Sequence, residues 1–461
     1  MLSKKIDHMV AGCNYLSLIF GLVALDREQS CLILDDTRFG LDEENLTSID
    51  QIKVELLRTI GEKYALAPLQ NIERYLVPHP LYILQNNMHL RLGRTPWENI
   101  QEIRRKISSI IKWPSASLPT EQEGDEQNFN RIYIEIADLA AKQIFSKSER
   151  DGDNNHLSTL LTNPDLPFGR EVAKLEKAIM HYGMDWLNYG QFASLINSTS
   201  SHLMGMPLYP PHRDNQTIRI LHAYALLSPI YQLDTLSLTN DLMKQFVLSG
   251  GIHKKSKIKS SAIHRQRVWA LELDSFDGLY HPEYLHLFDS NLSQTPFSFA
   301  KELPSYESVI VLSHYHDLSI RLPPNGEHIL LDQLSWDGGG NYPLTTLTFP
   351  TNSSIKACCY LPYRKGRKID FIQPKLSAML DQLLWKNWGI PSSKLKSRSI
   401  SPAKKAIPQR HKFCNELPQV IEISPANLVK SDPLINCFYH GPLANLTLGN
   451  TSLLLETLTS I

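Results

Sequence analysis

The chain has 461 residues, of which 42% are hydrophobic and 20% are charged, so it is neither a disordered chain nor a small disulfide-stapled domain. Its 47 Lys and Arg residues balance its 47 Asp and Glu residues. A surface that binds nucleic acid needs an excess of positive charge, so we predict no nucleic-acid partner. The length predicts two or three domains, or one large body in which two domains interleave.

The cysteines and the apolar runs indicate the compartment. The six cysteines form no Cys-x-x-Cys pair and several lie in apolar runs, so we interpret them as reduced, buried thiols. No stretch approaches the roughly 18 apolar residues of a membrane span, and the first apolar run is too short for a signal peptide. We therefore predict a cytoplasmic protein without a transmembrane segment.

The N-terminal residues predict a βαβ unit. Residues 6–11 have the pattern of a buried strand, residues 14–27 that of a helix, and residues 30–35 that of a second strand.

The remaining chain alternates between helical and strand patterns. Helical spacing first appears at Ile52, Leu56, Leu57 and Ile60. Further helices are predicted over 130–148, 170–200, 217–228, 235–248 and 371–389. Short strands are predicted over 81–85, 88–93, 252–258, 268–273 and 284–288, and strands dominate 306–361. Residues 391–418, rich in Lys, Ser and Pro, predict an exposed excursion, before a last strand over 434–440 and a last helix over 446–460.

The turn of the βαβ unit is the candidate nucleotide site. In a dinucleotide-binding unit, glycines bring the backbone and a helix N-terminus close to the pyrophosphate, and an acid that ends the second strand binds the ribose. Gly12 stands at the first glycine position, Asn14 at the second and Ser17 at the third, and Asp35 ends the second strand. The Asn14 side chain occupies space that the phosphates need. Two interpretations stay open: a weakened nucleotide site, or a plain βαβ unit that binds no nucleotide.

The order of these segments resembles the FAD-binding fold shared by amine oxidases, phytoene desaturases, protoporphyrinogen oxidase and the Rab guanine-nucleotide dissociation inhibitors. The shared features are the early βαβ unit, a helix that runs into Gly250-Gly251-Ile252, a following strand pair and a closing strand and helix. The resemblance implies an α/β fold in which a Rossmann-like FAD/NAD(P)-binding domain interleaves with a mixed α+β substrate domain. The FAD-binding domain would comprise residues 1–60, 216–295 and 426–461, with a mostly helical substrate or cap region over 61–215 and the substrate-domain sheet and helix over 296–425.

The resemblance also implies the positions that would contact FAD: Gly12, Cys13, Asn14, Ser17, Asp35, Arg38, Gly441 and Gly449. Amine-oxidising relatives often place a Lys on the first strand of the substrate sheet, and Val311 stands at that place here. Lys356 is either a substitute or a solvated edge residue. We therefore name no catalytic residue and do not predict amine oxidation.

Two other groups of residues allow both a functional and a structural interpretation. His314, His316, Asp317 and His328 suggest a metal site, but no fitting third ligand follows, so we favour a histidine-bearing sheet surface and predict no metal. Basic residues cluster over 253–267 and 394–412. These clusters either attract an acidic protein or a lipid surface, or they are solvated loops.

Two functional hypotheses follow. The first is an FAD-dependent oxidoreductase-like protein that oxidises a small organic substrate by hydride transfer to the flavin. The alternative is a flavin-free descendant of the same fold that binds an acidic protein or lipid partner. Asn14 and the loss of the glycine-rich arm after the second strand, where only Arg38-Phe39-Gly40 remains, favour this alternative.

Overall fold

A computed structural model shows an α/β fold built on two main sheets. It describes residues 3–35, 46–85, 88–110, 124–151, 177, 225–275, 278–288, 296–299, 306–316, 327–330, 334–336, 340–342, 345–351, 353–362, 369–403, 421–425 and 434–440.

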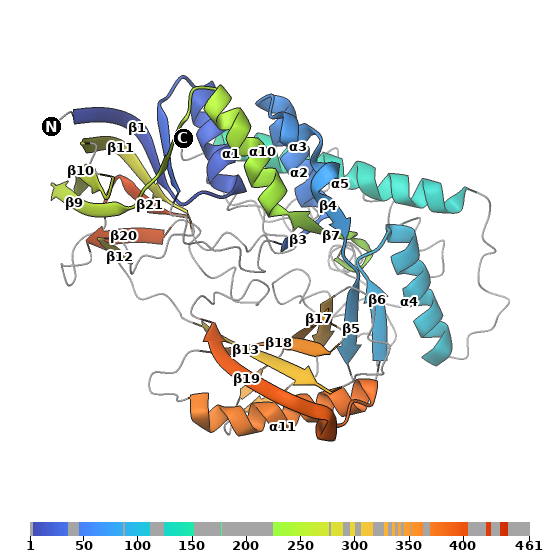
Figure 1. Ribbon diagram of the computed structural model, residues 1–461. Coiled ribbons are helices and arrows are strands. Elements are labelled where there is room, and N and C mark those ends of the chain that lie inside the picture. Colours follow the sequence, from blue (N-terminus) through green and yellow to red (C-terminus); the bar gives the residue numbers. More distant parts are fainter. Residues whose placement is uncertain are drawn as a thin grey trace.

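The first sheet has nine strands and joins segments from both ends of the chain (Figure 1). Its main path follows the order β12-β20-β21-β11-β1-β2-β8, and β10 and β9 extend it from β11 as an antiparallel meander. The strands are β1 (Ser3–Ala11), β2 (Cys31–Asp35), β8 (Ile252–Lys255), β9 (Ile258–His264), β10 (Arg267–Leu273), β11 (Leu279–Leu287), β12 (Phe297–Phe299), β20 (Ile421–Pro425) and β21 (Cys437–Tyr439).

The centre of this sheet is parallel, as the sequence predicts. The strands β1 and β2 pair in parallel with His8 opposite Cys31, which confirms the βαβ unit. Strand β8 also pairs in parallel with β2, and β11 pairs in parallel with both β1 and β21, whereas β20 is antiparallel to β21. Residues 31–34 form a continuous buried apolar run, which is typical of a strand covered on both faces. The chain's first strand and its last described strand therefore belong to one sheet.

Two helices cover one face of the first sheet, and the meander packs on the other. Helix α1 (Tyr15–Asp26) and helix α10 (Thr235–Leu248) lie side by side in Figure 1. Helix α10 ends before Gly250, which has a φ of +91°, and the chain then enters β8 beside β2. This arrangement confirms the predicted helix, Gly-Gly turn and strand. The predicted strand over 252–258 is in fact split between β8 and β9.

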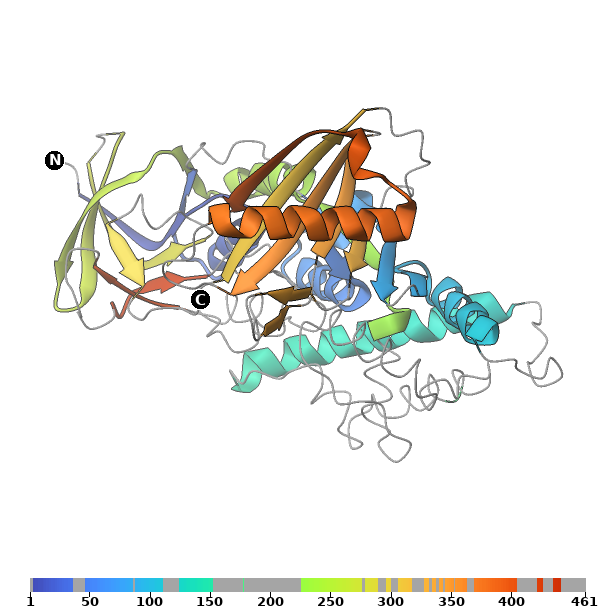
Figure 2. The same cartoon turned by 90° about the horizontal axis from the view of Figure 1, so that it is seen from below.

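The second sheet has seven strands in the order β19-β13-β18-β17-β14-β5-β6. They are β5 (Leu81–Gln85), β6 (Met88–Leu92), β13 (Tyr306–Tyr315), β14 (Glu327–Leu330), β17 (Thr345–Thr351), β18 (Ser354–Pro362) and β19 (Leu395–Ala403). Helix α11 (Ile369–Trp388) lies across this sheet in Figure 2, and Leu380 and Leu384 pack with Val311 of β13 in one buried cluster. The short helix η5 (Ser392–Lys394) leads into β19, and β15 (Leu334–Trp336) pairs with β16 (Gly340–Tyr342) as a separate ribbon.

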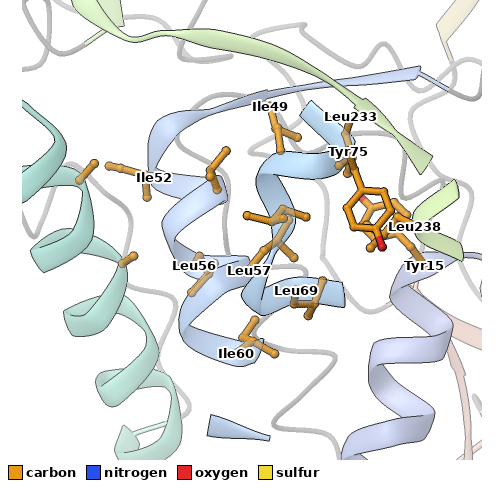
Figure 3. Close-up of a cluster of buried hydrophobic side chains, with 14 of the residues drawn as sticks. Tyr15, Ile49, Ile52, Leu56, Leu57, Ile60, Leu69, Tyr75, Leu233 and Leu238 are labelled. Carbon is orange, nitrogen blue, oxygen red and sulfur yellow. The ribbon is translucent and has the colours of Figure 1, made fainter. Parts of the chain in front are cut away.

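A smaller three-stranded sheet and several helices complete the described chain. The strands are β3 (Leu46–Asp50), β4 (Leu76–Pro78) and β7 (Ile230–Asp234), and the helices are α2 (Gln51–Lys63), α3 (Ala67–Gln70), η1 (Ile72–Tyr75), α4 (Pro96–Ile110) and α5 (Asp125–Asp151). Figure 3 shows the buried side chains of α2, including Leu56, Leu57 and Ile60, packed near Leu69 and Leu238. The helical spacing predicted for these three α2 residues is thus confirmed as the buried face of a helix.

Two of the sequence-based expectations differ from the structure. The excursion expected over 391–418 is wrong for residues 395–403, because they form β19 and pair with β13 along the second sheet. The strands β12 and β20 lie in the first sheet, although the substrate-domain segment was expected to include them. The predicted helices over 170–200, 217–228 and 446–460 lie wholly or largely outside the described residues. Within the described part of the chain, no helix has the length and apolarity needed to cross a membrane.

Candidate functional site

Gly12 directly follows β1, at a point where two strands and a helix meet. Its φ is +102°, and a Cβ atom placed on it would lie only 1.8 Å from the carbonyl oxygen of Phe288. Its N–H donates to the carbonyl oxygen of Leu34 (3.0 Å), and the N–H of Phe288 donates to that of Ala11 (2.7 Å). A glycine is therefore required at this position by the close approach of β11, whether or not a nucleotide binds.

Asn14 is the N-cap of α1. Its side-chain oxygen Oδ1 accepts hydrogen bonds from the backbone N–H groups of Leu16 (3.0 Å) and Ser17 (2.9 Å). The Ser17 hydroxyl accepts from the Asn14 N–H at 2.9 Å and lies 2.8 Å from the Asn14 carbonyl oxygen. Together these bonds form a capping box, which satisfies the donors that a helix normally leaves unpaired at its start.

This cap closes the place where a pyrophosphate would bind. In dinucleotide-binding folds the phosphate accepts hydrogen bonds from N–H groups at the start of the first helix, and a glycine at the second position leaves those groups accessible. Here two of them already bond to the Asn14 side chain. Asn14 itself has an extended backbone, with φ −143°, that any residue adopts. The described residues of this turn therefore do not fit a pyrophosphate.

Asp35 keeps the position of the ribose-binding acid. It ends β2, its side chain is 27% exposed, and its Oδ2 atom lies 3.5 Å from Nε2 of His253 on β8. The nearby Cys13 thiol is a poor nucleophile, because burial, together with the Asp35 carboxylate, raises its pKa to about 12. Because its side chain is partly exposed, Asp35 is accessible to a ligand, and His253 is its neighbour in this structure.

The remaining predicted contacts fall in different places. Arg38, Gly441 and Gly449 lie outside the described residues. Val311 is fully buried in the core between the second sheet and α11, and Lys356 lies on β18 opposite Leu312. The structure brings Gly12, Asn14 and Ser17 together at one turn, and Asp35 lies on the strand beside it.

Two of the histidines considered as metal ligands, His314 and His316, are on the surface. His314 is exposed on β13, and His316 is exposed just beyond its end. Asp317 and the side chain of His328 are not described. Among the described residues, no group of three or more His, Cys, Asp or Glu side chains is arranged to hold a metal ion.

Several residues of the two basic clusters have partners within the chain. Lys254 donates to the hydroxyl of Tyr280 at 2.6 Å, and Lys259 pairs with Glu272 at 2.7 Å. In the second cluster, Arg398 is nearly buried on β19 and pairs with Asp381 of α11 at 2.6 Å. The second cluster is therefore not a solvated loop over residues 395–403, whereas Lys404, Lys405, Arg410 and Lys412 lie outside the described residues.

The sequence analysis missed a row of buried histidines in the first sheet. Nδ1 of His8 lies 3.2 Å from Nε2 of His286, and Nδ1 of His286 lies 2.9 Å from Nε2 of His440. All three side chains are buried, and the aromatic ring of Phe20 from α1 lies against each of them. Three parallel strands that are distant in sequence are thus joined by side-chain contacts beneath α1.

Burial keeps these imidazoles neutral. It lowers the pKa of His8 and holds that of His286 well below its ordinary value, with a further effect from the neighbouring histidines. Burial also lowers the pKa of His440 to about 3. A charged imidazole in this position would lack the solvation that water provides.

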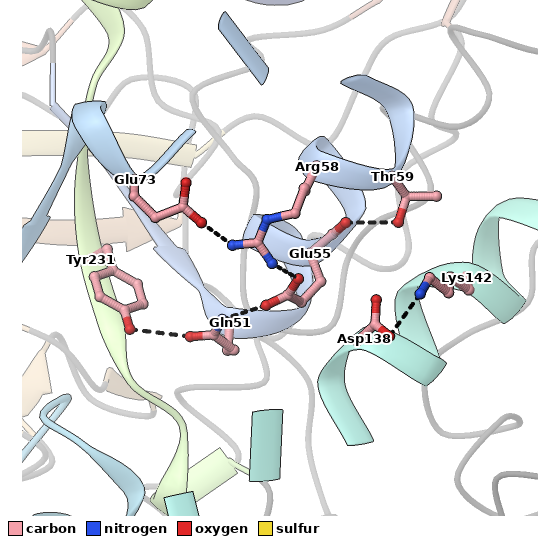
Figure 4. A network of polar contacts seen from close by, with 8 residues as sticks. All are labelled: Gln51, Glu55, Arg58, Thr59, Glu73, Asp138, Lys142 and Tyr231. Carbon is pink, nitrogen blue, oxygen red and sulfur yellow. Dashed lines mark hydrogen bonds and ion pairs between the residues drawn. The ribbon is translucent and has the colours of Figure 1, made fainter. Parts of the chain in front are cut away.

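A second polar group lies on α2. In Figure 4, Glu55 accepts a hydrogen bond from Gln51 (2.7 Å) and pairs with Arg58, which also contacts Glu73. The Tyr231 hydroxyl donates to Gln51 at 3.1 Å. Burial raises the pKa of Glu55, although the hydrogen bond from Gln51 and the charge of Arg58 oppose that shift. Each of these polar side chains is thus paired with another, and the contacts connect α2 to β7 and η1.

Comparison with known proteins yields similarity at the level of the fold. No protein-family model matches the chain, and no curated protein matches it. Among solved structures, Rab GDI from Plasmodium falciparum is 10% identical, with 100% of this chain and 98% of that chain covered and a TM-score of 0.48. L-proline dehydrogenase from P. horikoshii is 11% identical (99% and 92% covered, TM-score 0.39). PqsL from Pseudomonas aeruginosa, described as a probable FAD-dependent monooxygenase, is 8% identical (98% and 84% covered, TM-score 0.39).

Proposed function

We propose that this chain is a flavin-free binding protein on a dinucleotide-binding fold, and that its partner is an acidic protein. The capping box of α1 is the observation that carries this proposal. Asn14 takes up the N–H groups of Leu16 and Ser17, which a pyrophosphate would need. A phosphate would have to break both bonds before it could make its own.

The energetic effect of this cap is large enough to measure. An Asn N-cap stabilises a helix by about 1 kcal/mol relative to Ala, whereas Gly at the same position costs only a few tenths. Hydrogen bonds to a charged acceptor contribute about 1.5–3 kcal/mol each. Replacing Asn14 with glycine therefore frees two donors at little cost to the fold, and we expect the affinity for FAD to rise at least about 10-fold.

The test is a titration of the purified protein with FAD, followed by flavin fluorescence and visible absorbance. We expect the wild-type protein to be colourless and to take up no FAD, and Asn14→Gly to bind it measurably. Asp234→Gly is the matched control, because Asp234 caps α10 in the same way through the N–H of Ser237. A wild-type protein that binds FAD, or an Asn14→Gly variant that binds none, would contradict the proposal.

The acidic partner follows from the exposed cations on the first sheet. Arg265 and Arg267 stand at the turn between β9 and β10, and both are exposed. Such a group creates a local positive field although the net charge of the chain is zero. We expect binding to immobilised poly-glutamate that weakens with added salt, and a loss of binding when these two arginines are changed to Gln. Binding to anionic lipid vesicles alone would contradict a protein partner.

A second candidate function is an FAD-dependent oxidoreductase that acts on a small organic substrate. Two observations favour it: Gly12 keeps the first glycine position with a positive φ, and Asp35 keeps the acid position with part of its carboxylate exposed. FAD that co-purifies with the wild-type protein would favour this candidate over the binding protein.

A further inference from the structure

We propose that His8, His286 and His440 form an acid-sensitive latch that holds β21 in the first sheet at neutral pH and releases it when the imidazoles take up protons. This inference is independent of the proposed partner and of flavin binding. It assigns a conformational role to the row of buried histidines, and it names the segment that moves.

The row crosses the sheet diagonally. His8 lies opposite Tyr284 on β11, while His286 lies two positions further along, opposite Val10. On the next strand, His286 pairs with Phe438, so that His440 again lies two positions further. The row therefore begins inside β1 and ends at His440, directly after β21.

Neutral imidazoles fit this row. A neutral imidazole has one N–H donor and one acceptor nitrogen, so a row of three makes both internal hydrogen bonds when all three share one tautomer. At the first end, Nε2 of His8 lies 3.2 Å from the side-chain oxygen of Gln29, which can only accept. This contact sets the direction in which His440 donates to His286 and His286 donates to His8. An additional proton leaves a cation inside the row, and a second one places two N–H donors face to face.

Burial opposes such a charge on each of the three imidazoles and lowers the pKa of all three. The charged groups that act on His8 are Asp7, Glu283 and Arg27, and His286 is further affected by His440 and His8. Among the described residues, aromatic rings of Phe20, Tyr284, Phe288 and Phe438 lie against the row.

Strand β21 is the element of the row that can leave most easily. It pairs with β11 at three positions and with β20 at two, and the N–H of His440 donates to the carbonyl oxygen of Leu287, whereas β1 pairs with β11 at eight positions and with β2 at four. Asn436 anchors the chain immediately before β21 through bonds to Val268 and Glu283. Short elements with few pairings open at lower free energy than central strands. Acid is thus expected to detach residues 437–440, with Asn436 as the fixed point.

The experiment measures amide hydrogen exchange in β21 of the full chain between pH 7.5 and pH 5, corrected for the intrinsic pH dependence of exchange. If opening exposes His440 with its ordinary pKa of about 6.5, the opening constant rises about 30-fold over this range, and about 900-fold if His286 is exposed as well. Strand β13 of the second sheet is the internal reference and is expected to stay protected. A rise in β21 below about 10-fold, or an equal rise in β13, would overturn the proposal.

A conservative variant of His440 tests whether the protonation of this residue, and not its packing, causes the acid-induced opening. His440→Gln keeps a side-chain N–H donor for His286 but does not titrate, so we expect it to reduce the acid-induced rise by about 30-fold. The matched control is His264→Gln, because His264 is exposed on β9 outside the row. An unchanged rise in His440→Gln would overturn the latch. If this variant does not fold, the pH dependence of exchange in the wild-type protein still tests the latch.

Discussion

Replacing Gly12 with alanine should destabilise the protein much more than the same replacement at Gly250, although both glycines have positive φ angles of +102° and +91°. A Cβ atom at Gly250 would meet no atom within 4 Å, so the cost there is the strain of the left-handed backbone, about 1–2 kcal/mol. At Gly12 the same strain applies, but the new Cβ would also lie 1.8 Å from the carbonyl oxygen of Phe288.

Relief of that contact requires β11 to move away from the end of β1. The movement breaks the bond from Phe288 N to Ala11 O, at about 1 kcal/mol, and loosens the packing of the fully buried Phe288 ring. We therefore expect Gly12→Ala to cost about 4 kcal/mol or more.

Urea unfolding followed by circular dichroism measures both variants against the wild type. The backbone strain is common to both variants. The difference between their losses in the free energy of unfolding therefore measures the effect of the close contact between Gly12 and β11. If Gly12→Ala cost no more than Gly250→Ala, β11 would not lie against this turn as described, and the reasoning would fail.

Two further predictions concern buried charge. The pKa values of His286 and His440 are depressed in the folded protein, so the stability they contribute is present above pH 6.5 and is lost as the pH falls. Between pH 7 and pH 5 we expect the free energy of unfolding to fall by about 2 kcal/mol for each, and a total drop below about 1 kcal/mol in urea titrations would refute this. Arg398→Met removes bonds to Asp381 and to Ser313, and we expect a loss of about 3 kcal/mol, against less than about 0.5 for the exposed control Lys396→Met. Equal midpoints in urea for these two variants would show that the Arg398 ion pair does not stabilise the second sheet.

Local sequence patterns predict the parallel centre of the first sheet well. The apolar runs 6–11 and 30–35 and the helix between them appear in the structure within a few residues, because most of their residues are buried. The run from α10 through Gly250 into β8 was predicted for a similar reason: a glycine with positive φ commonly follows the end of a helix.

Segments whose structure depends on distant partners were not predicted. Residues 395–403 have the composition of a loop, but they form β19 because β13 supplies the backbone partners and Asp381 accepts Arg398. The short strand β3 was missed, since it is defined by pairing with β7, which follows it by about 180 residues.

In the candidate site, too, local features could be predicted from the sequence and contacts between distant segments could not. Asn14 with Ser17 three residues later is a recognisable cap signal, so its bonds to the helix start could have been predicted from the sequence. The histidine row could not, because its members lie 278 and 154 residues apart and meet only through the register of three strands.

The central claim is that the first helix of this fold is closed to a pyrophosphate by its own capping residue. The most direct test is equilibrium binding of FAD to the wild-type protein, measured beside Asn14→Gly under identical conditions. Our account predicts no uptake by the wild type and measurable uptake by the variant. A wild-type protein that retains FAD through desalting and shows the visible absorbance bands of bound flavin would contradict it.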